Sequence, residues 1–155
     1  MALIEFVEVH PDSAEAEACL GRYYAEIAGR FDGGFDPAQS SAPTLDDFAP
    51  PGGTFLVVRL DGALVGCGGF KRDAPDTAYL KRMWVAPEAR GHGLGRRLLH
   101  ELEEKARSLG YRKIHLETEK TLSEAQGLYR ASGYVEVPAF NDELYAHHWF
   151  EKTLR

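Results

Sequence analysis

Cysteine and long apolar runs are both scarce in this chain of 155 residues. Its two cysteines, Cys19 and Cys67, are too few for the disulfide framework of a small secreted domain. The first residues, Met-Ala-Leu-Ile-Glu, lack the basic and apolar regions of a signal peptide. No apolar run reaches the roughly 20 residues that a membrane span needs. We therefore expect a cytoplasmic protein that does not enter a membrane.

Positively charged residues are fewer than negatively charged ones. Lysine and arginine number 18 against 24 aspartates and glutamates, which gives a formal net charge of −6. Binding to nucleic acid needs clustered cations, so we expect no nucleic-acid partner. The hydrophobic content of 44% and the charged content of 27% are typical of a folded globular protein. The length suits a single domain over residues 1–155.

Apolar periodicity predicts a chain that mixes strands and helices. Strands are expected over residues 2–9, 54–60, 63–70, 79–85, 113–118, 134–137 and 145–152, and helices from about residue 14 to 31, over 94–109 and over 124–132. Asp12 or Ser13 can cap the first helix, and Ser123 can cap the last. Asp61-Gly62 predicts a hairpin turn, and the glycines at 66, 68 and 69 predict a bulge or a close backbone approach.

A long segment from residue 32 to 53 is rich in Gly, Pro, Ser and Asp. We expect a loop here, with one short helix near residues 44–48. Loops of this length in a compact domain are usually functional or disordered. The segment is interpreted either as a lid that presents negative charge to a ligand or as a solvated acidic loop without a role.

The sequence Arg90-Gly91-His92-Gly93-Leu94-Gly95 joins a predicted strand to a predicted helix. Its glycines allow backbone N–H groups to turn toward a ligand at the positive end of the helix, which favours an anion. A dinucleotide fingerprint would need glycine at position 96, where Arg96 stands, and the Gly-Lys-Ser/Thr of a Walker loop is absent. The pattern predicts a phosphate site of another kind, or a plain glycine-rich turn with solvated arginines.

Two motifs in this order and spacing resemble the GCN5-related N-acetyltransferase (GNAT) family. The first comprises Val85, Pro87, Arg90, Gly91, Gly93 and Gly95, and the second comprises Glu124, Ala125, Leu128, Tyr129, Gly133 and Tyr134. The resemblance implies an α/β fold with a mixed, mostly antiparallel twisted sheet and helices on both faces, in the order β-α-α-β-β-β-α-β-α-β-β. It also implies acetyl-coenzyme A as cosubstrate. No metal is expected, because the histidines show no metal-ligand pattern.

The resemblance carries roles to particular positions. The backbones of Met83, Trp84 and Val85 would pair with the pantetheine arm, and one N–H would face the thioester oxygen. The loop would hold the pyrophosphate through Arg90, Gly91, His92, Gly93, Leu94, Gly95 and Arg96. Tyr129 would donate a proton to the departing thiolate. The implied activity is transfer of the acetyl group to a primary amine by direct attack in a ternary complex.

Two positions depart from the family's pattern. Tyr79 stands where many relatives carry glutamate, and Leu122 stands where asparagine often binds the pantetheine. Glu117 or Glu119 could deprotonate the amine through water, Glu119 could instead bind a cationic substrate, or no dedicated base is needed.

The acceptor stays open at this stage. A small primary amine or an amino-acid-like molecule is expected, because the acidic loop favours a cation whereas Lys81 or Arg82 could receive a carboxylate. The alternatives are a protein or peptide acceptor, and a sensor module that binds acyl-coenzyme A without turning it over. An exposed terminal strand would also permit a homodimer.

Overall fold

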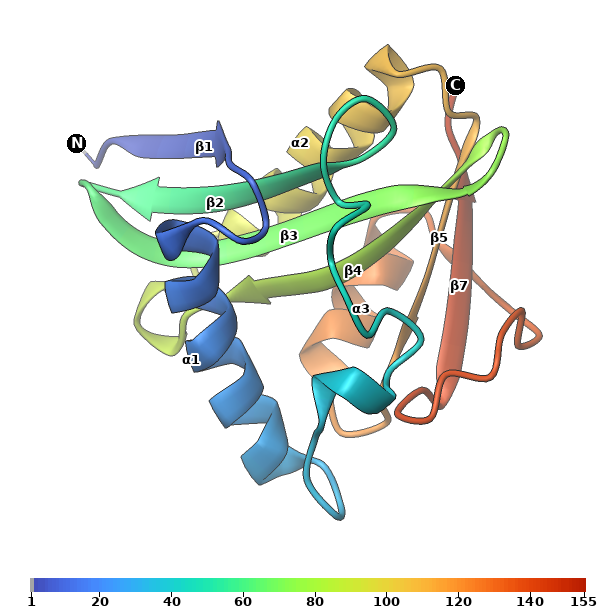
Figure 1. Cartoon of the computed structure of the whole chain (residues 1–155), viewed down its shortest axis with the longest axis horizontal. Coiled ribbons are helices and arrows are strands. Elements are labelled where there is room, and N and C mark those ends of the chain that lie inside the picture. Colours follow the sequence, from blue (N-terminus) through green and yellow to red (C-terminus); the bar gives the residue numbers. More distant parts are fainter. Residues whose placement is uncertain (1) are drawn as a thin grey trace.

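The computed structural model describes residues 2–155, which form one sheet of seven strands in the order β1-β2-β3-β4-β5-β7-β6. In chain order the elements are β1 (Ile4–Glu8), α1 (Ala14–Arg30), η1 (Pro37–Gln39), β2 (Thr54–Leu60), β3 (Ala63–Ala74), β4 (Thr77–Val85), η2 (Pro87–Ala89), α2 (Leu94–Ser108), β5 (Lys113–Thr118), α3 (Ser123–Ala131), β6 (Val135–Val137) and β7 (His148–Thr153). Helix α1 lies on one face of the sheet, and α2 and α3 lie on the other (Figure 1). The α/β architecture with helices on both faces is confirmed.

Helix α1 begins where the sequence predicts a cap. The Ser13 hydroxyl accepts a hydrogen bond from the Ala16 amide at 3.2 Å, so the choice between Asp12 and Ser13 falls to Ser13. The prediction for α3 is wrong, because Ser123 is already helical and the preceding Leu122 makes no side-chain cap.

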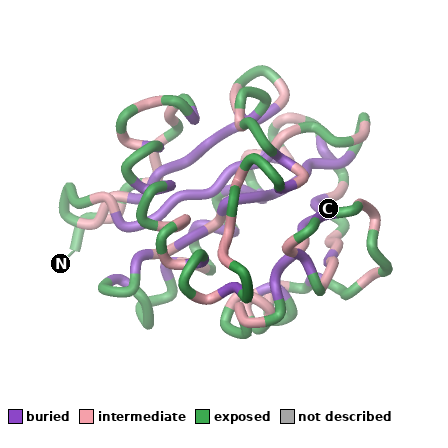
Figure 2. Tube along the Cα trace, turned by 60° about the horizontal axis from the view of Figure 1, so that its bottom comes forward, coloured by how far each residue is buried: buried purple, intermediate pink, exposed green. Residues whose placement is uncertain are grey.

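The helices cover both faces of the central strands, and this explains why those strands are apolar on both sides. Residues 54–58 of β2 are all buried, and Figure 2 shows buried backbone following the central strands while the connecting loops are exposed. None of the helices in residues 2–155 combines the length and the apolar character that a membrane crossing requires.

The short helix expected near residues 44–48 is absent from that place. The 3₁₀ helix lies earlier, at Pro37–Gln39, because the Asp36 side chain accepts from the Ala38 amide and Pro37 supplies a fixed φ at the first position. Residues 44–48 instead form a turn that buries Phe48 completely. Strand β7 also starts three residues later than predicted, because the chain turns between Glu143 and Ala146.

A gap in the sheet separates β4 from β5. These strands are the one parallel pair among the described residues, and they pair only over Thr77–Tyr79 and Lys113–His115. Beyond this point β4 carries a bulge: the register with β3 shifts between Cys67 and Gly69, and Arg82 adopts a positive φ of 60°. A bulge bends and twists its strand, so the end of β4 turns away from β5.

The glycine pattern in β3 marked this irregularity. A Cβ atom on Gly68 would lie 3.1 Å from the Leu102 side chain and 3.2–3.3 Å from Met83. The close approach predicted for the glycine-rich part of β3 is therefore confirmed at Gly68, opposite the bulge.

Candidate active site

A groove of about 420 Å³ lies between α1, the end of β4, the loop before α2, and α3. Of the predicted coenzyme-binding residues it brings together Met83, Trp84, Val85, Arg90, Gly91, Gly93, Leu94, Gly95 and Arg96. His92 is exposed and does not line the groove.

The loop before α2 has the backbone geometry that its glycines suggested. Gly91 and Gly93 have φ values of 86° and 75°, in the left-handed region that side chains disfavour. Gly93 precedes the first turn of α2, where no side chain caps the free N–H groups. A Cβ atom on Gly91 or Gly93 would meet no other atom within 4 Å, so the space over this turn is open.

Arg90 lines the groove, but its guanidinium is already engaged. Its Nε donates to the Val85 carbonyl at 2.9 Å, and its Nη2 donates to both carboxylate oxygens of Glu26 at 2.7 Å. Glu26 also accepts from the Trp84 indole at 3.0 Å. Burial raises the pKa of Glu26, but the bonds from Arg90 and Trp84 outweigh it and hold that pKa below its usual value. Arg90 thus fixes the wall of the groove, whereas the Arg96 side chain is exposed.

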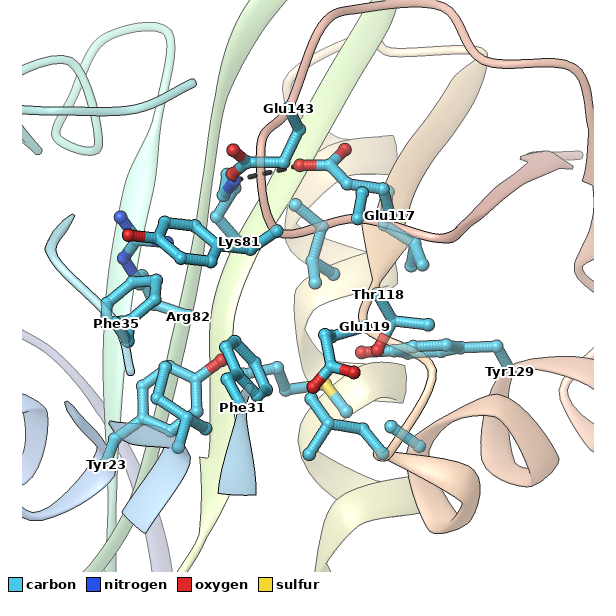
Figure 3. A pocket seen from close by; sticks show the side chains of 18 residues that line it. Tyr23, Phe31, Phe35, Lys81, Arg82, Glu117, Thr118, Glu119, Tyr129 and Glu143 are labelled. Carbon is cyan, nitrogen blue, oxygen red and sulfur yellow. Dashed lines mark hydrogen bonds and ion pairs between the residues drawn. The ribbon is translucent and has the colours of Figure 1, made fainter. Parts of the chain in front are cut away.

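A second cavity, of about 70 Å³, lies beside the groove, in the gap between β4 and β5 (Figure 3). The two spaces have six lining residues in common: Tyr23, Ile27, Met83, Leu122, Ala125 and Tyr129. A ligand in the groove can therefore meet a ligand in the cavity within the gap between β4 and β5.

Tyr129 reaches this meeting point from α3. Its ring packs against Tyr134 and Phe150 with centroid distances of 5.8 and 5.9 Å, and 6% of the residue is exposed. Burial raises the pKa of Tyr129 above the usual value for a phenol, with a smaller contribution from the charge of Glu117. The hydroxyl is therefore protonated at neutral pH and can donate a hydrogen bond.

Both predicted carboxylates line the second cavity. Glu119 accepts from the Thr121 amide at 2.9 Å and from the Thr121 hydroxyl at 2.6 Å. Glu117 has a side chain that is 2% exposed, and one oxygen accepts from Lys81 at 2.8 Å and from the Tyr79 hydroxyl. The Tyr79 hydroxyl thus donates to a neighbouring carboxylate.

Sequence reasoning missed the buried cluster to which Glu117 belongs. Lys81 lies between Glu117 and Glu143, and all three side chains are at most 7% exposed. Burial raises the pKa of Glu143, but the charge of Lys81 outweighs it, so that pKa is lowered. Ser41 donates to Glu143 and lies 3.0 Å from Lys81. No local pattern pointed to Glu143, because it lies in an irregular segment 62 residues after Lys81.

Comparison with known proteins gives a family. The model of the "Acetyltransferase (GNAT) family" matches residues 20–134. The chain is 39% identical over 118 residues to an "IAA acetyltransferase" of Azospirillum brasilense, a match that covers 74% of this chain and 76% of that protein.

Solved structures agree with this result. The structure of a putative acyl-CoA N-acyltransferase from Klebsiella pneumoniae is similar with a TM-score of 0.80 and 27% identity over 99% of both chains. An N-acetyltransferase from Thermoplasma acidophilum, solved in complex with coenzyme A, has the same fold with a TM-score of 0.75, 20% identity and coverage of 97% of this chain and 99% of that one. The chain therefore belongs to the acetyltransferase (GNAT) family and is an N-acetyltransferase enzyme.

Proposed function

We propose that the protein transfers the acetyl group of acetyl-coenzyme A to a primary amine by direct attack in a ternary complex. The observation that carries this proposal is the meeting of the groove and the second cavity at Tyr129, inside the gap between β4 and β5. Coenzyme A bound to a protein of the same fold supports the use of an acyl-coenzyme A.

The pyrophosphate of the coenzyme would lie over the free amides between Gly91 and Arg96. The open space above Gly91 and Gly93 and the positive end of α2 both favour an anion there. The pantetheine arm would follow the end of β4 into the gap. The bulge at Arg82 leaves a backbone group outside the ladder, and such an N–H can stabilise the oxyanion of the tetrahedral intermediate.

In the reaction the amine nitrogen bonds to the thioester carbon, and the carbon–sulfur bond then breaks. Tyr129 donates to the departing thiolate. Because burial raises the pKa of Tyr129 above that of a thiol, about 8.5, its hydrogen bond stabilises the thiolate and the phenol retains its proton for most of the reaction.

Glu119 is the better of the two carboxylates for accepting the amine's proton. Glu117 is bonded to Lys81 and Tyr79, and its second oxygen is fully buried. Glu119 is held only by Thr121 and a distant His147 ring at 3.8 Å, and it lines the path to the outside.

A longer acceptor is the second candidate. A further cavity of about 290 Å³ has Phe31, Glu119 and Tyr145 in common with the second cavity, which we call the inner cavity from here on. A peptide whose amino terminus entered the inner cavity could extend into this outer space.

The test is release of the coenzyme A thiol from acetyl-coenzyme A with and without primary amines and short peptides. Release that depends on the amine, with a mass increase of one acetyl group on the acceptor, supports the proposal. Coenzyme binding without any acceptor-dependent release would overturn it and favour the sensor.

A further inference from the structure

The two cations of the inner cavity decide which acceptors it can hold. Lys81 has three N–H donors, and it contacts Glu117 at 2.8 Å, Ser41 at 3.0 Å and Glu143. Its donors are therefore used within the protein, and its side chain is 7% exposed. Lys81 is not free to receive a carboxylate.

Arg82 is engaged as well. Its guanidinium donates to the Ser40 hydroxyl at 2.8 Å, to the Ala42 carbonyl at 3.1 Å and to the Tyr24 hydroxyl at 3.2 Å. Figure 3 shows it beside Phe35, on the opposite side of the cavity from Tyr129. Only 5% of Arg82 is exposed. Its bonds fasten the segment of residues 40–42 to β4.

Negative charge is in excess on the walls of the inner cavity. Glu117, Glu119 and Glu143 are three carboxylates against the cations Lys81 and Arg82. Lys81 is shared by Glu117 and Glu143, and the one ion pair of Glu119 is with the 44% exposed His147 ring at 3.8 Å, although Arg30 is near enough to feel the charge of Glu119. A positively charged ligand would balance this excess, whereas a carboxylate would add to it.

Aromatic rings line the entrance beside Glu119. Tyr145 lies 4.7 Å from Phe35 and 6.0 Å from Phe31 between ring centroids, and all three residues border the inner cavity. Such rings bind the carbon body of an amine and attract its cationic group.

We propose that the acceptor is a cationic primary amine that carries no carboxylate, and that Glu119 receives its ammonium group. This inference rests on the proposed acetyl transfer and narrows its substrate class. The ammonium gives one proton to Glu119, the neutral nitrogen bonds to the acetyl carbon, and the carbon–sulfur bond breaks. The nitrogen loses a second proton as the amide forms, and the thiolate sulfur takes up one, so amide, thiol and one released proton are the products.

The test uses matched acceptors that differ in the carboxylate: tyramine, tyrosine and tyrosine methyl ester, with phenethylamine and phenylalanine as a second pair. We measure kcat/KM by thiol release at saturating acetyl-coenzyme A. The amine should exceed the amino acid by at least about 100-fold, because like charges placed together cost several kcal/mol and 1.4 kcal/mol is tenfold. The methyl ester should approach the amine.

The ester separates charge from size. An ester as poor as the amino acid would show that bulk at the α-carbon sets the selection, and it would overturn the proposal, as would equal or better turnover of the amino acids. If no acceptor released thiol although coenzyme bound, acetyl transfer itself would fail and this inference with it.

The variant Glu119→Gln tests whether Glu119 receives the ammonium group. The variant should raise the KM for tyramine at least tenfold and reduce the preference for tyramine over tyrosine, with coenzyme affinity unchanged. Glu101→Gln, on the exposed surface of α2, is the matched control and should change neither. An unchanged preference in Glu119→Gln would remove Glu119 from this role.

Discussion

At the scale of single residues, Tyr129 offers the most direct test of the chemistry. Tyr129→Phe keeps the ring that packs against Tyr134 and Phe150 and removes only the hydroxyl. We expect kcat to fall by about 100-fold, a usual effect for a general acid, while the Kd of coenzyme A stays the same. Steady-state kinetics and calorimetric titration measure the two quantities, and unchanged turnover would exclude the role.

The pH dependence follows from the same residue. An acid must be protonated to act, and burial raises the pKa of Tyr129. Activity that depends on Tyr129 is therefore present throughout the neutral range and is lost only well above pH 10. A fall in kcat below that pH must come from another group.

Gly95 allows a clean test of the phosphate site. Gly91 and Gly93 have positive φ, so any side chain there strains the backbone. Gly95 is helical, and an added Cβ would touch only Leu128 at 3.4 Å. Gly95→Ala should stabilise α2 by about 0.5–1 kcal/mol and weaken coenzyme binding at least tenfold, because the methyl group narrows the groove between Gly95 and Leu128. Thermal melting and calorimetric titration give the two values.

The control for this variant is Gly127→Ala. Gly127 lies in α3, does not line the groove, and has open space at its Cβ position. It should gain similar stability and bind coenzyme normally. Equal affinity in both variants would move the pyrophosphate away from this turn.

Lys81 tests the buried cluster. Lys81→Met leaves Glu117 and Glu143 buried without their cation, so we expect a loss of about 3–5 kcal/mol in the free energy of unfolding at pH 7. Lys120→Met, whose side chain is 56% exposed, should cost less than 1 kcal/mol. Urea denaturation measures both, and equal losses would contradict the argument.

Glu143 determines how the stability contributed by this cluster changes with pH. Its pKa is lowered in the folded protein, so the stability it contributes is present above the unfolded pKa of about 4.3. That contribution is lost as the pH falls through the lowered pKa. The difference between wild type and Lys81→Met should therefore shrink in acid.

At the scale of elements, ion pairs join α1 to the walls of the coenzyme groove. Arg30 of α1 contacts Glu124 of α3 and donates to the Thr121 carbonyl at 2.5 Å, and both Arg30 and Glu124 line the groove. The two helices lie on opposite faces of the sheet (Figure 1), so this pair joins two walls of the groove in which we propose that the coenzyme binds.

We expect Arg30→Ala to speed both association and dissociation of coenzyme A by about two- to fivefold, the effect of an exposed pair worth less than 1 kcal/mol. Stopped-flow binding measures the rates. Arg22→Ala removes the comparable Arg22–Glu88 pair at 2.7 Å, which lies outside the groove, and should leave them unchanged. Rates of Arg30→Ala equal to those of wild type would show that the pair does not obstruct entry.

The elements that the sequence predicted well are those that local pattern determines. The glycine-rich loop and the hairpin at Asp61-Gly62 follow from backbone freedom, and α2 follows from leucines at helical spacing. The short helix was misplaced because an aspartate cap and a proline at Asp36-Pro37 outweighed the polar composition of residues 44–48. The glycines of β3 predicted a bulge or a close approach, but they could not reveal the gap between β4 and β5, because that gap depends on how far the two strands pair.

At the scale of the whole molecule, the two halves of the site differ in how far the sequence could predict them. The groove takes about half of its lining from one continuous stretch, residues 83–96, and most of that stretch was predicted, whereas the walls from α1 and, apart from Tyr129, from α3 were not. The inner cavity is lined by residues of α1, β4, β5 and the segment before β7. Contacts such as Ser41 with Tyr79 and Lys81 with Glu143 join distant parts of the chain, so no local pattern could reveal them.

Coenzyme binding should also show in amide hydrogen exchange. We expect protection of residues 80–85 and 116–118, whose backbones diverge at the gap, when coenzyme A is present. The hairpin of β6 and β7 lies beyond β5 and should exchange at the same rate with and without coenzyme. Protection confined to other strands would contradict the placement of the pantetheine arm.

The three residue pairs between β4 and β5 have a mechanical meaning. Among the described strands only the edge strand β6 pairs with its neighbour over as few residues, whereas β4 and β5 lie inside the sheet. The protein therefore resembles two half-sheets joined by a short paired segment. A cosubstrate bound between β4 and β5 would therefore stabilise the sheet as well as react. Product release then removes these stabilising contacts, and thermal unfolding of the empty enzyme should begin with the separation of β4 from β5.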